Sequence, residues 1–405
     1  MNGPQDTAAG LVEPARRPAL ATVSTLLVQA LGSLCIAVPS VLAPAIAPSL
    51  GHAPERVGVF VGLAYFAAMV AGLWSGRGVA MVGAVGLSQA ALVSFAAGMA
   101  LVTAGSGVAL IAVALLMGAG YGMINPSAAA LLNQHAPPAH RALLFSVKQS
   151  GVPIGVAGAG VLMPLGLAVL GWQSTLWVVA AVCGLYALAL TLARRPLEPG
   201  RYALDQVPAG KPGSLARVFK DPSLRLISIA SFAFAFSQLC FMTFLVSFLN
   251  LELGHSLALA AGVLAASQVV STVGRIGWGV VADRWIAPGR LLGWLGIGAG
   301  LSFVGLGTLG HLPGEVPTGW IIAAAMVCAL TSMSWNGVFF AELARLAGRG
   351  EMASIAGASQ AVTFCGSMAG PIVFSELIRY GVGYGNAYWT VALLPVAAGV
   401  AMLRR

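Results

Sequence analysis

Two basic residues lie inside long apolar stretches of the sequence, where a charged side chain is costly. Lys148 and Arg275 are each several residues away from the nearest polar segment. On insertion scales, a charge near the centre of a membrane-spanning helix costs roughly 2.5–3.5 kcal/mol, so such residues usually mark a binding site or an ion pathway. At a rise of 1.5 Å per helical residue, Arg275 would lie about 12 Å and Lys148 about 9 Å inside the membrane.

No aspartate or glutamate lies deep in any apolar stretch, so a cavity that holds both cations would be net positive. Glu342 and Glu376 lie near the ends of apolar stretches, each three residues before an arginine, which predicts local ion pairs. Guanidinium binds a carboxylate through two hydrogen bonds, and an ammonium acts as a point charge. The pattern therefore predicts an anion site. Snorkelling to the membrane surface is the alternative for Lys148, and pairing with backbone carbonyls or gate residues is the alternative for Arg275.

Other polar or aromatic residues in the apolar stretches are candidates for the same cavity. The predicted substrate-binding residues besides the two cations are Tyr121, Asn125, Gln149, Gln268, Trp335, Asn336 and Gln360. Interhelical hydrogen bonds are the alternative for Asn125, Asn336, Gln149 and Gln360. For Gln268 and Trp335, as for Gln29, Tyr65 and Gln238, packing or anchoring at the membrane interface is the alternative. The five cysteines lie in apolar stretches and predict packing, so neither a metal site nor a cofactor is expected.

The elements that would position these residues are membrane-spanning helices. The chain has 405 residues, of which 58% are hydrophobic and 8% charged, and its mean hydropathy is +0.89. Soluble proteins carry roughly 25% charged residues, so a soluble enzyme is excluded. Apolar runs of about 20 residues can cross a bilayer as helices. We predict twelve, over residues 20–46, 57–75, 79–103, 107–134, 142–170, 172–193, 224–250, 257–282, 290–310, 318–345, 352–379 and 384–403.

The predicted helices form two groups of six. Residues 1–19 are expected to form a cytoplasmic tail, 20–193 an N-terminal bundle, 194–223 a cytoplasmic linker and 224–405 a C-terminal bundle. With both termini inside, 17 basic residues face the cytoplasm and 2 face outward, which is the bias of inner-membrane proteins. The sequence therefore predicts a multi-pass protein of a bacterial-type inner (plasma) membrane with cytoplasmic N- and C-termini.

The two halves repeat each other. At an offset of 211 residues, Asn125 matches Asn336, Gln149 matches Gln360 and Gly155 matches Gly366. Two six-helix halves related by a parallel repeat are typical of one large transporter class, whose substrate site lies near mid-membrane. The two buried cations have no counterpart in the other half, because Lys148 aligns with serine and Arg275 with alanine. Residues needed only for folding would more often occur in both halves, so this asymmetry favours a functional role.

Loop and helix motifs resemble those of the major facilitator superfamily. The C-terminal copy of its loop signature reads Gly274-Arg275-Ile-Gly-Trp-Gly279-Val-Val-Ala282-Asp283-Arg284, followed by Pro288-Gly289-Arg290. The N-terminal copy is the degenerate Gly72-Leu-Trp-Ser75-Gly76-Arg77-Gly78, in which glycine replaces the acid. The fifth helix carries a glycine-rich stretch, residues 151–160. The resemblance implies an all-α integral membrane fold of two pseudo-symmetric bundles around a central cavity. It also implies a cytoplasmic gate, to which we assign Arg77, Asp283, Arg284 and Arg290.

The spacing of Arg275 before Gly279 and Asp283 resembles the substrate arginine of the monocarboxylate and oxalate branches of that superfamily. The monocarboxylate branch has a proton-carrying aspartate four residues earlier, where this chain has Ser271. That difference leaves anion exchange and uniport open beside proton symport. A tyrosine in the fourth helix lines the site of that branch, and Tyr121 is the candidate here.

These observations predict a transporter that moves a small, monocarboxylate-like organic anion by alternating access. Its expected partners are the anion, the lipid bilayer and either protons or a counter-anion. It is expected to act as a monomer, not to be an enzyme and not to bind nucleic acid. Two alternatives remain open: proton-coupled efflux of a small hydrophobic compound, and a membrane receptor or assembly factor that transports nothing.

Overall fold

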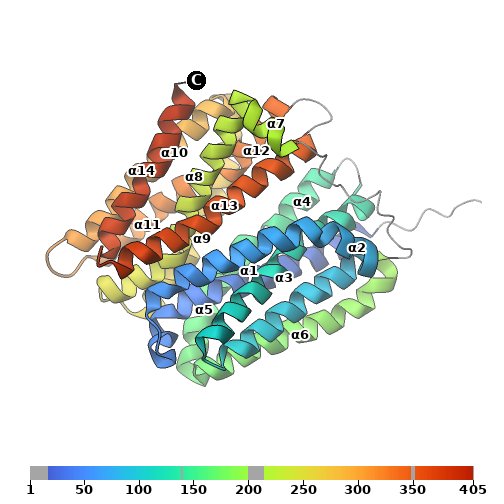
Figure 1. The fold of residues 1–405 in the computed structure, drawn as a ribbon, viewed down its shortest axis with the longest axis horizontal. Coiled ribbons are helices and arrows are strands. Elements are labelled where there is room, and N and C mark those ends of the chain that lie inside the picture. Colours follow the sequence, from blue (N-terminus) through green and yellow to red (C-terminus); the bar gives the residue numbers. More distant parts are fainter. Residues whose placement is uncertain (1–16, 138–139, 199–213, 348–351, 405) are drawn as a thin grey trace, which may run out of the picture.

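The fold consists of two bundles of helices side by side (Figure 1). The computed structural model describes residues 17–137, 140–198, 214–347 and 352–404, and every regular element among them is helical. Eleven described segments are long and apolar enough to cross a membrane, and one of them holds two predicted spans. The predicted all-α membrane fold is confirmed. The predicted tail and linker lie largely outside the described residues.

The first bundle contains the predicted first six spans. Its helices are α1 (Pro18–Ile46), α2 (Val57–Val102), α3 (Gly107–His135), α4 (Arg141–Gln149), α5 (Gly151–Leu170) and α6 (Trp172–Leu197), with short 3₁₀ turns at Pro48–Leu50 and Pro54–Arg56. The fifth span combines α4 and α5. Ser150 lies between them with helical dihedral angles, so the two helices continue each other with only a local disturbance.

The helix α2 is broken at Gly83 and contains the second and third spans. A straight helix of its 46 residues would be about 69 Å long, more than twice the thickness of the bilayer core. Gly83 has φ 83° and ψ 166°, a conformation that residues with a Cβ avoid. The sequence prediction placed this turn at residues 76–78. The chain instead stays helical through that motif and turns several residues later.

The second bundle repeats the arrangement of the first. Its helices are α8 (Pro222–Ser247), α9 (Leu257–Arg284), α10 (Pro288–Thr308), α11 (Thr318–Ser332), α12 (Asn336–Ala347), α13 (Met352–Arg379) and α14 (Tyr384–Leu403), with the short helix α7 (Ser214–Lys220) before them. A π-helical turn at Phe248–Glu252 ends α8, and a 3₁₀ turn at Leu309–His311 ends α10. The tenth span is interrupted, because residues 333–335 between α11 and α12 are not helical.

Repeated glycines have the same packing role in both bundles. Gly155 of α5 lies against the backbone carbonyl of Ala30 in α1. Its repeat partner Gly366 of α13 lies against the carbonyl of Phe232 in α8. A Cβ at either glycine would collide with that carbonyl. Small residues that allow helices to approach closely are typical of membrane bundles, so the sequence repeat corresponds to a repeated helix contact.

The bundles touch near one end and diverge toward the other. Gly58 and Gly62 of α2 contact Pro371 and Ile372 of α13, and Ser375 of α13 donates to the Glu55 carbonyl across 2.7 Å. In Figure 1 the bundles separate toward the end where α6 finishes and α7 begins, here called the linker end. The two bundles are therefore packed against each other at one end and are separated at the other.

Candidate functional site

A large cavity lies between the two bundles. Its volume is about 1760 Å³, and helices of both bundles line it. Drug-sized pockets span roughly 300–1,000 Å³, so this cavity has room for a small ligand together with water. Leu73, Ile276 and Phe340 line its linker end and are 76%, 69% and 39% exposed. The cavity is therefore open at the linker end.

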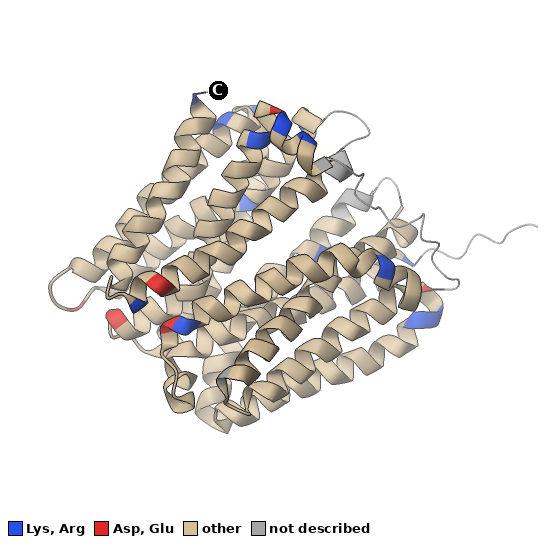
Figure 2. Cartoon of the chain, viewed as in Figure 1, with Lys and Arg blue, Asp and Glu red and all other residues tan. Residues whose placement is uncertain are grey.

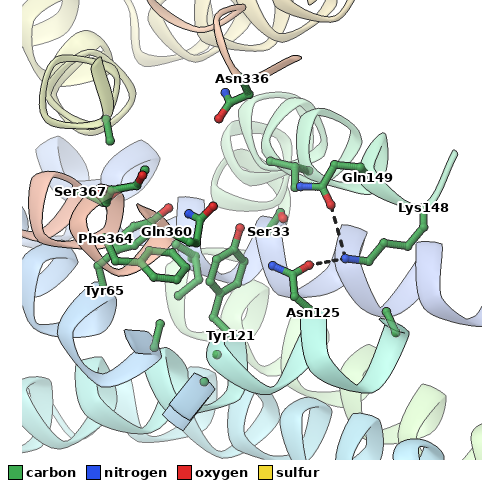
Figure 3. A pocket seen from close by; sticks show the side chains of 18 of the residues that line it. Ser33, Tyr65, Tyr121, Asn125, Lys148, Gln149, Asn336, Gln360, Phe364 and Ser367 are labelled. Atoms are coloured by element: carbon green, nitrogen blue, oxygen red, sulfur yellow. Dashed lines mark hydrogen bonds between the residues drawn. The ribbon is translucent and has the colours of Figure 1, made fainter. Parts of the chain in front are cut away.

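Lys148 lies in the cavity wall and is held by neutral side chains. Its ammonium donates to Gln29 Oε1 at 2.6 Å, Asn125 Oδ1 at 2.5 Å and Gln149 Oε1 at 3.4 Å. Figure 3 shows the Asn125 and Gln149 amides pointing at the ammonium. The lysine is 3% exposed, so its side chain does not reach the membrane surface as snorkelling requires.

Arg275 faces the cavity from the opposite bundle. Its Nε donates to the Met333 carbonyl at 3.3 Å, and the Ser271 hydroxyl donates to the same oxygen at 3.2 Å. Met333 belongs to the non-helical segment between α11 and α12. Irregular backbone at membrane depth is tolerated where it is buried in protein or lines a cavity. The break in the tenth span thus supplies a free carbonyl that positions the arginine.

Aromatic residues line the middle of the cavity. Tyr65 packs edge-on against Tyr121, with ring centroids 6.0 Å apart, and lies 6.3 Å from Phe364 of the other bundle. The Tyr121 hydroxyl interacts with Ser33 and Gln29, and Figure 3 shows it pointing into the cavity. Together these rings form a bridge between the two bundles.

The structure brings nearly all the predicted substrate-binding residues together. Lys148, Arg275, Tyr121, Asn125, Gln149, Trp335, Asn336 and Gln360 all line the cavity. Trp335 also donates through Nε1 to Gln238 Oε1 at 2.9 Å. Gln268 does not line it: this residue is 1% exposed and donates to Ser267 of its own helix at 3.4 Å. The position of Gln268 within a span could not reveal that it faces away from the cavity, because the direction of the side chain depends on how α9 packs.

The cavity lining that the structure describes contains two cations and no acid. The acids that the structure describes lie instead at or near helix ends or in loops, as the red segments of Figure 2 show. Glu252 accepts from the backbone N–H groups of Tyr384 and Gly385 at 2.7 and 3.0 Å, which caps the start of α14. A carboxylate at a helix N-terminus satisfies free N–H groups and the helix dipole.

Two further acids lie at the linker end. Glu198 accepts from the Val85 N–H at 3.0 Å, just after the break at Gly83, and lies 3.8 Å from Arg194. Burial raises the pKa of this carboxyl, and the hydrogen bond from Val85 opposes that rise. Glu342 pairs with Arg345 at 2.6 Å, as predicted, and lies against Gly289 at the start of α10.

The predicted gate residues lie at the open end, on the surface. Arg77, Asp283, Arg284 and Arg290 are all exposed. Arg77 stacks on Trp74, with its guanidinium carbon 5.0 Å from the ring centroid. Within the described ranges, no ion pair to Asp283 is formed. Their role as a gate stays a prediction.

Several residues of the site carried only a weak sequence signal. Gln29 and Ser33 are one helical turn apart, and Gln29 Nε2 donates to Ser33 Oγ at 3.2 Å. A polar pair at this spacing inside an apolar helix indicates a polar face, but not which residue it contacts. Phe364 gave no signal, because phenylalanine is common in membrane helices.

The chain matches the profile of the Major Facilitator Superfamily over residues 25–371. An uncharacterized MFS-type transporter of Mycobacterium tuberculosis (strain CDC 1551 / Oshkosh) is 25% identical over 284 residues, which cover 70% of this chain and 61% of that protein. The hexuronate transporter of Bacillus subtilis (strain 168) is 25% identical over 183 residues, covering 44% of this chain and 43% of that protein. The matches thus span about three fifths or less of these relatives' lengths.

Solved structures share the fold over nearly the whole chain. The peptide transporter POT in complex with sulfate superposes with a TM-score of 0.76 at 15% identity, covering 97% of this chain and 96% of that one. A bacterial homolog of the human lysosomal transporter Spinster, in an inward-facing and occupied conformation, gives 0.71 at 16% identity, covering 95% and 94%. At these identities the likeness extends to the fold alone.

Proposed function

We propose, from the premise that this chain belongs to the major facilitator superfamily and is a membrane transporter, that it carries a small organic anion by alternating access. The observation that carries the proposal is the charge of the cavity. Arg275 and Lys148 face it from opposite bundles, and its described lining contains no acid. A buried cation without a carboxylate partner favours an anionic ligand.

The amides and aromatic rings of the lining refine the substrate class. Asn125, Gln149, Asn336 and Gln360 offer both donors and acceptors, which suits a carboxylate that also carries hydroxyl groups. The distant likeness to a hexuronate transporter supports this choice. We therefore favour a hydroxylated monocarboxylate, held by Arg275 through two hydrogen bonds and by Lys148 through its charge.

The orientation follows from the distribution of basic residues. The positive-inside bias assigns the linker end to the cytoplasm, so the cavity of this structure opens inward. Binding of the anion between the two cations would draw the bundles together at that end. Arg77, Asp283, Arg284 and Arg290 lie where such a closure would bring the bundles into contact. We assign the protein to the inner membrane and expect one chain to suffice, since both cavity walls come from it.

The test is uptake of labelled carboxylates into proteoliposomes by the wild type, Arg275→Ala and Arg275→Lys. The carboxylate that the wild type transports can be found first by a thermal-shift screen with lactate, glucuronate, oxalate, amines and neutral sugars. We expect both variants to lose at least tenfold in transport, because lysine cannot replace a bidentate guanidinium. Unchanged uptake in both would remove Arg275 from the site, and protonophore-sensitive efflux of uncharged or cationic compounds would favour the efflux alternative.

A further inference from the structure

The surroundings of Lys148 are suited to a group that changes its charge. An ammonium has three donors, and three amide oxygens accept from this one: Gln29 from α1, Asn125 from α3 and Gln149 from α4. No described acid lies within ion-pair distance of it. The charged form is thus hydrogen-bonded but not neutralised, in a side chain that is 3% exposed.

The same three amides can also hold the neutral amine. A carboxamide presents an acceptor oxygen on one side and a donor NH₂ group on the other, and rotation by 180° exchanges them. With one amide rotated, the amine donates two N–H groups to two amide oxygens and accepts from the third amide. A carboxylate partner could not do this, because an ionised acid only accepts hydrogen bonds.

The two cations of the cavity differ in this respect. Arginine stays protonated in proteins, whereas a buried lysine can release its proton. The other titratable or charged side chains of the described cavity wall are Tyr121 and Tyr65 in the first bundle and Arg275 in the second. None of them is an acid that would hold Lys148 in its charged form.

We infer that Lys148 is the group that binds and releases the coupling proton, and that Gln29, Asn125 and Gln149 form a cradle for both of its charge states. The inference rests on the proposed anion transport and adds the coupling ion. As the anion leaves, the ammonium passes one proton to cavity water and becomes an amine. It takes up one proton as the next anion enters. One proton moves with one anion, and no covalent bond other than N–H changes.

A labelling experiment can observe this group directly, because the chain has only three lysines: Lys148, Lys211 and Lys220. Protein grown with lysine labelled with ¹³C at Cε should give three signals in nanodiscs, without any substrate. Lys220 is exposed and Lys211 belongs to the predicted linker. Lys211→Arg and Lys220→Arg each remove one signal and assign the third, even if Lys148→Met fails to fold.

An unperturbed lysine side chain has a pKa near 10.4 and keeps its ammonium shift up to about pH 9. The signal of Lys148 should change from ammonium to amine between about pH 5 and pH 9, the range in which a proton-transferring group is effective. A Lys148 signal that stays ammonium, or stays amine, over that whole range would overturn the inference.

A transport measurement adds an independent readout. In proteoliposomes, an inwardly directed proton gradient should accelerate net glucuronate uptake at least threefold in the wild type. In Lys148→Arg the ratio of rates with and without the gradient should fall to about one, whatever the residual rate. A retained ratio would contradict coupling through Lys148. Absence of wild-type glucuronate flux would count against the proposed substrate class, and the NMR titration would still decide whether Lys148 changes charge.

Discussion

At the scale of single residues, the site is defined by two cations that the sequence could locate and by partners that it could not. A charge inside an apolar stretch is visible in the sequence alone. The acceptors of Lys148 are not, because Gln29 and Asn125 lie 119 and 23 residues away from it. Gln268 shows the opposite case, since its position resembles that of a lining residue and the packing of α9 turns it away from the cavity. Local patterns reveal which groups are unusual, and tertiary structure decides what they contact.

Gln29 provides a sensitive test of whether Lys148 serves the anion. In Gln29→Glu the new carboxylate would replace an amide oxygen 2.6 Å from the ammonium, so Lys148 would pair internally. We expect the KM for the transported carboxylate to rise at least tenfold, about 1.4 kcal/mol of binding free energy. Gln29→Met removes the acceptor without adding charge, and its KM should rise less. Equal kinetics for Gln29→Glu and the wild type would show that the anion does not use the ammonium.

At the scale of helices, the positions of the breaks and caps were only partly predictable from local sequence patterns. The second and third spans were expected to separate near the loop motif, but the turn occurs at Gly83, where the carboxylate of Glu198 lies against the glycine. The break in the tenth span was not expected, because residues 333–335 are as apolar as their neighbours. It is stabilised by hydrogen bonds with α9, which no local signal contains.

The contact between Gly83 and Glu198 can be tested against a second glycine with matching backbone angles. Gly171 has φ 75° and ψ 166°, close to Gly83, yet a Cβ there would meet nothing within 4 Å. Alanine at either position should cost roughly 1–3 kcal/mol of strain. Only Gly83→Ala also displaces the cap of the third span, so its apparent Tm in detergent should fall further than that of Gly171→Ala. Equal Tm values would mean that the cap adds no stability.

At the scale of the whole molecule, the twelve spans, the two halves and the repeat were predictable, because membrane thickness and hydropathy restrict helices strongly. Which end of the cavity is open was not predictable, since this depends on contacts between the bundles. Those contacts lie at the opposite end, where Gly58 and Gly62 allow α2 to approach α13. The described gate residues make no contact that would close the linker end. The contact between α2 and α13, here called the seal, therefore holds the bundles in their present arrangement.

Enlarging Gly58 should weaken that seal. In Gly58→Leu the side chain would meet the Pro371 carbonyl, Phe244 and Ser375, so the closed end should open more often. A cysteine introduced at Ser40, which lines the cavity, should then react at least threefold faster with an impermeant maleimide added outside the cell. Gly184→Leu is the control, because its Cβ would meet nothing within 4 Å. Equal labelling of the two variants would place the seal elsewhere.

The location of the hydrogen-bond partners of each buried cation has a consequence for insertion of the chain into the membrane. Lys148 is hydrogen-bonded to side chains of the first bundle, and Arg275 to a backbone carbonyl of the second. Each half of the chain therefore contains the hydrogen-bond partners of its own buried cation. We expect the first six spans to supply the amide acceptors of Lys148 while the rest of the chain is still being translated.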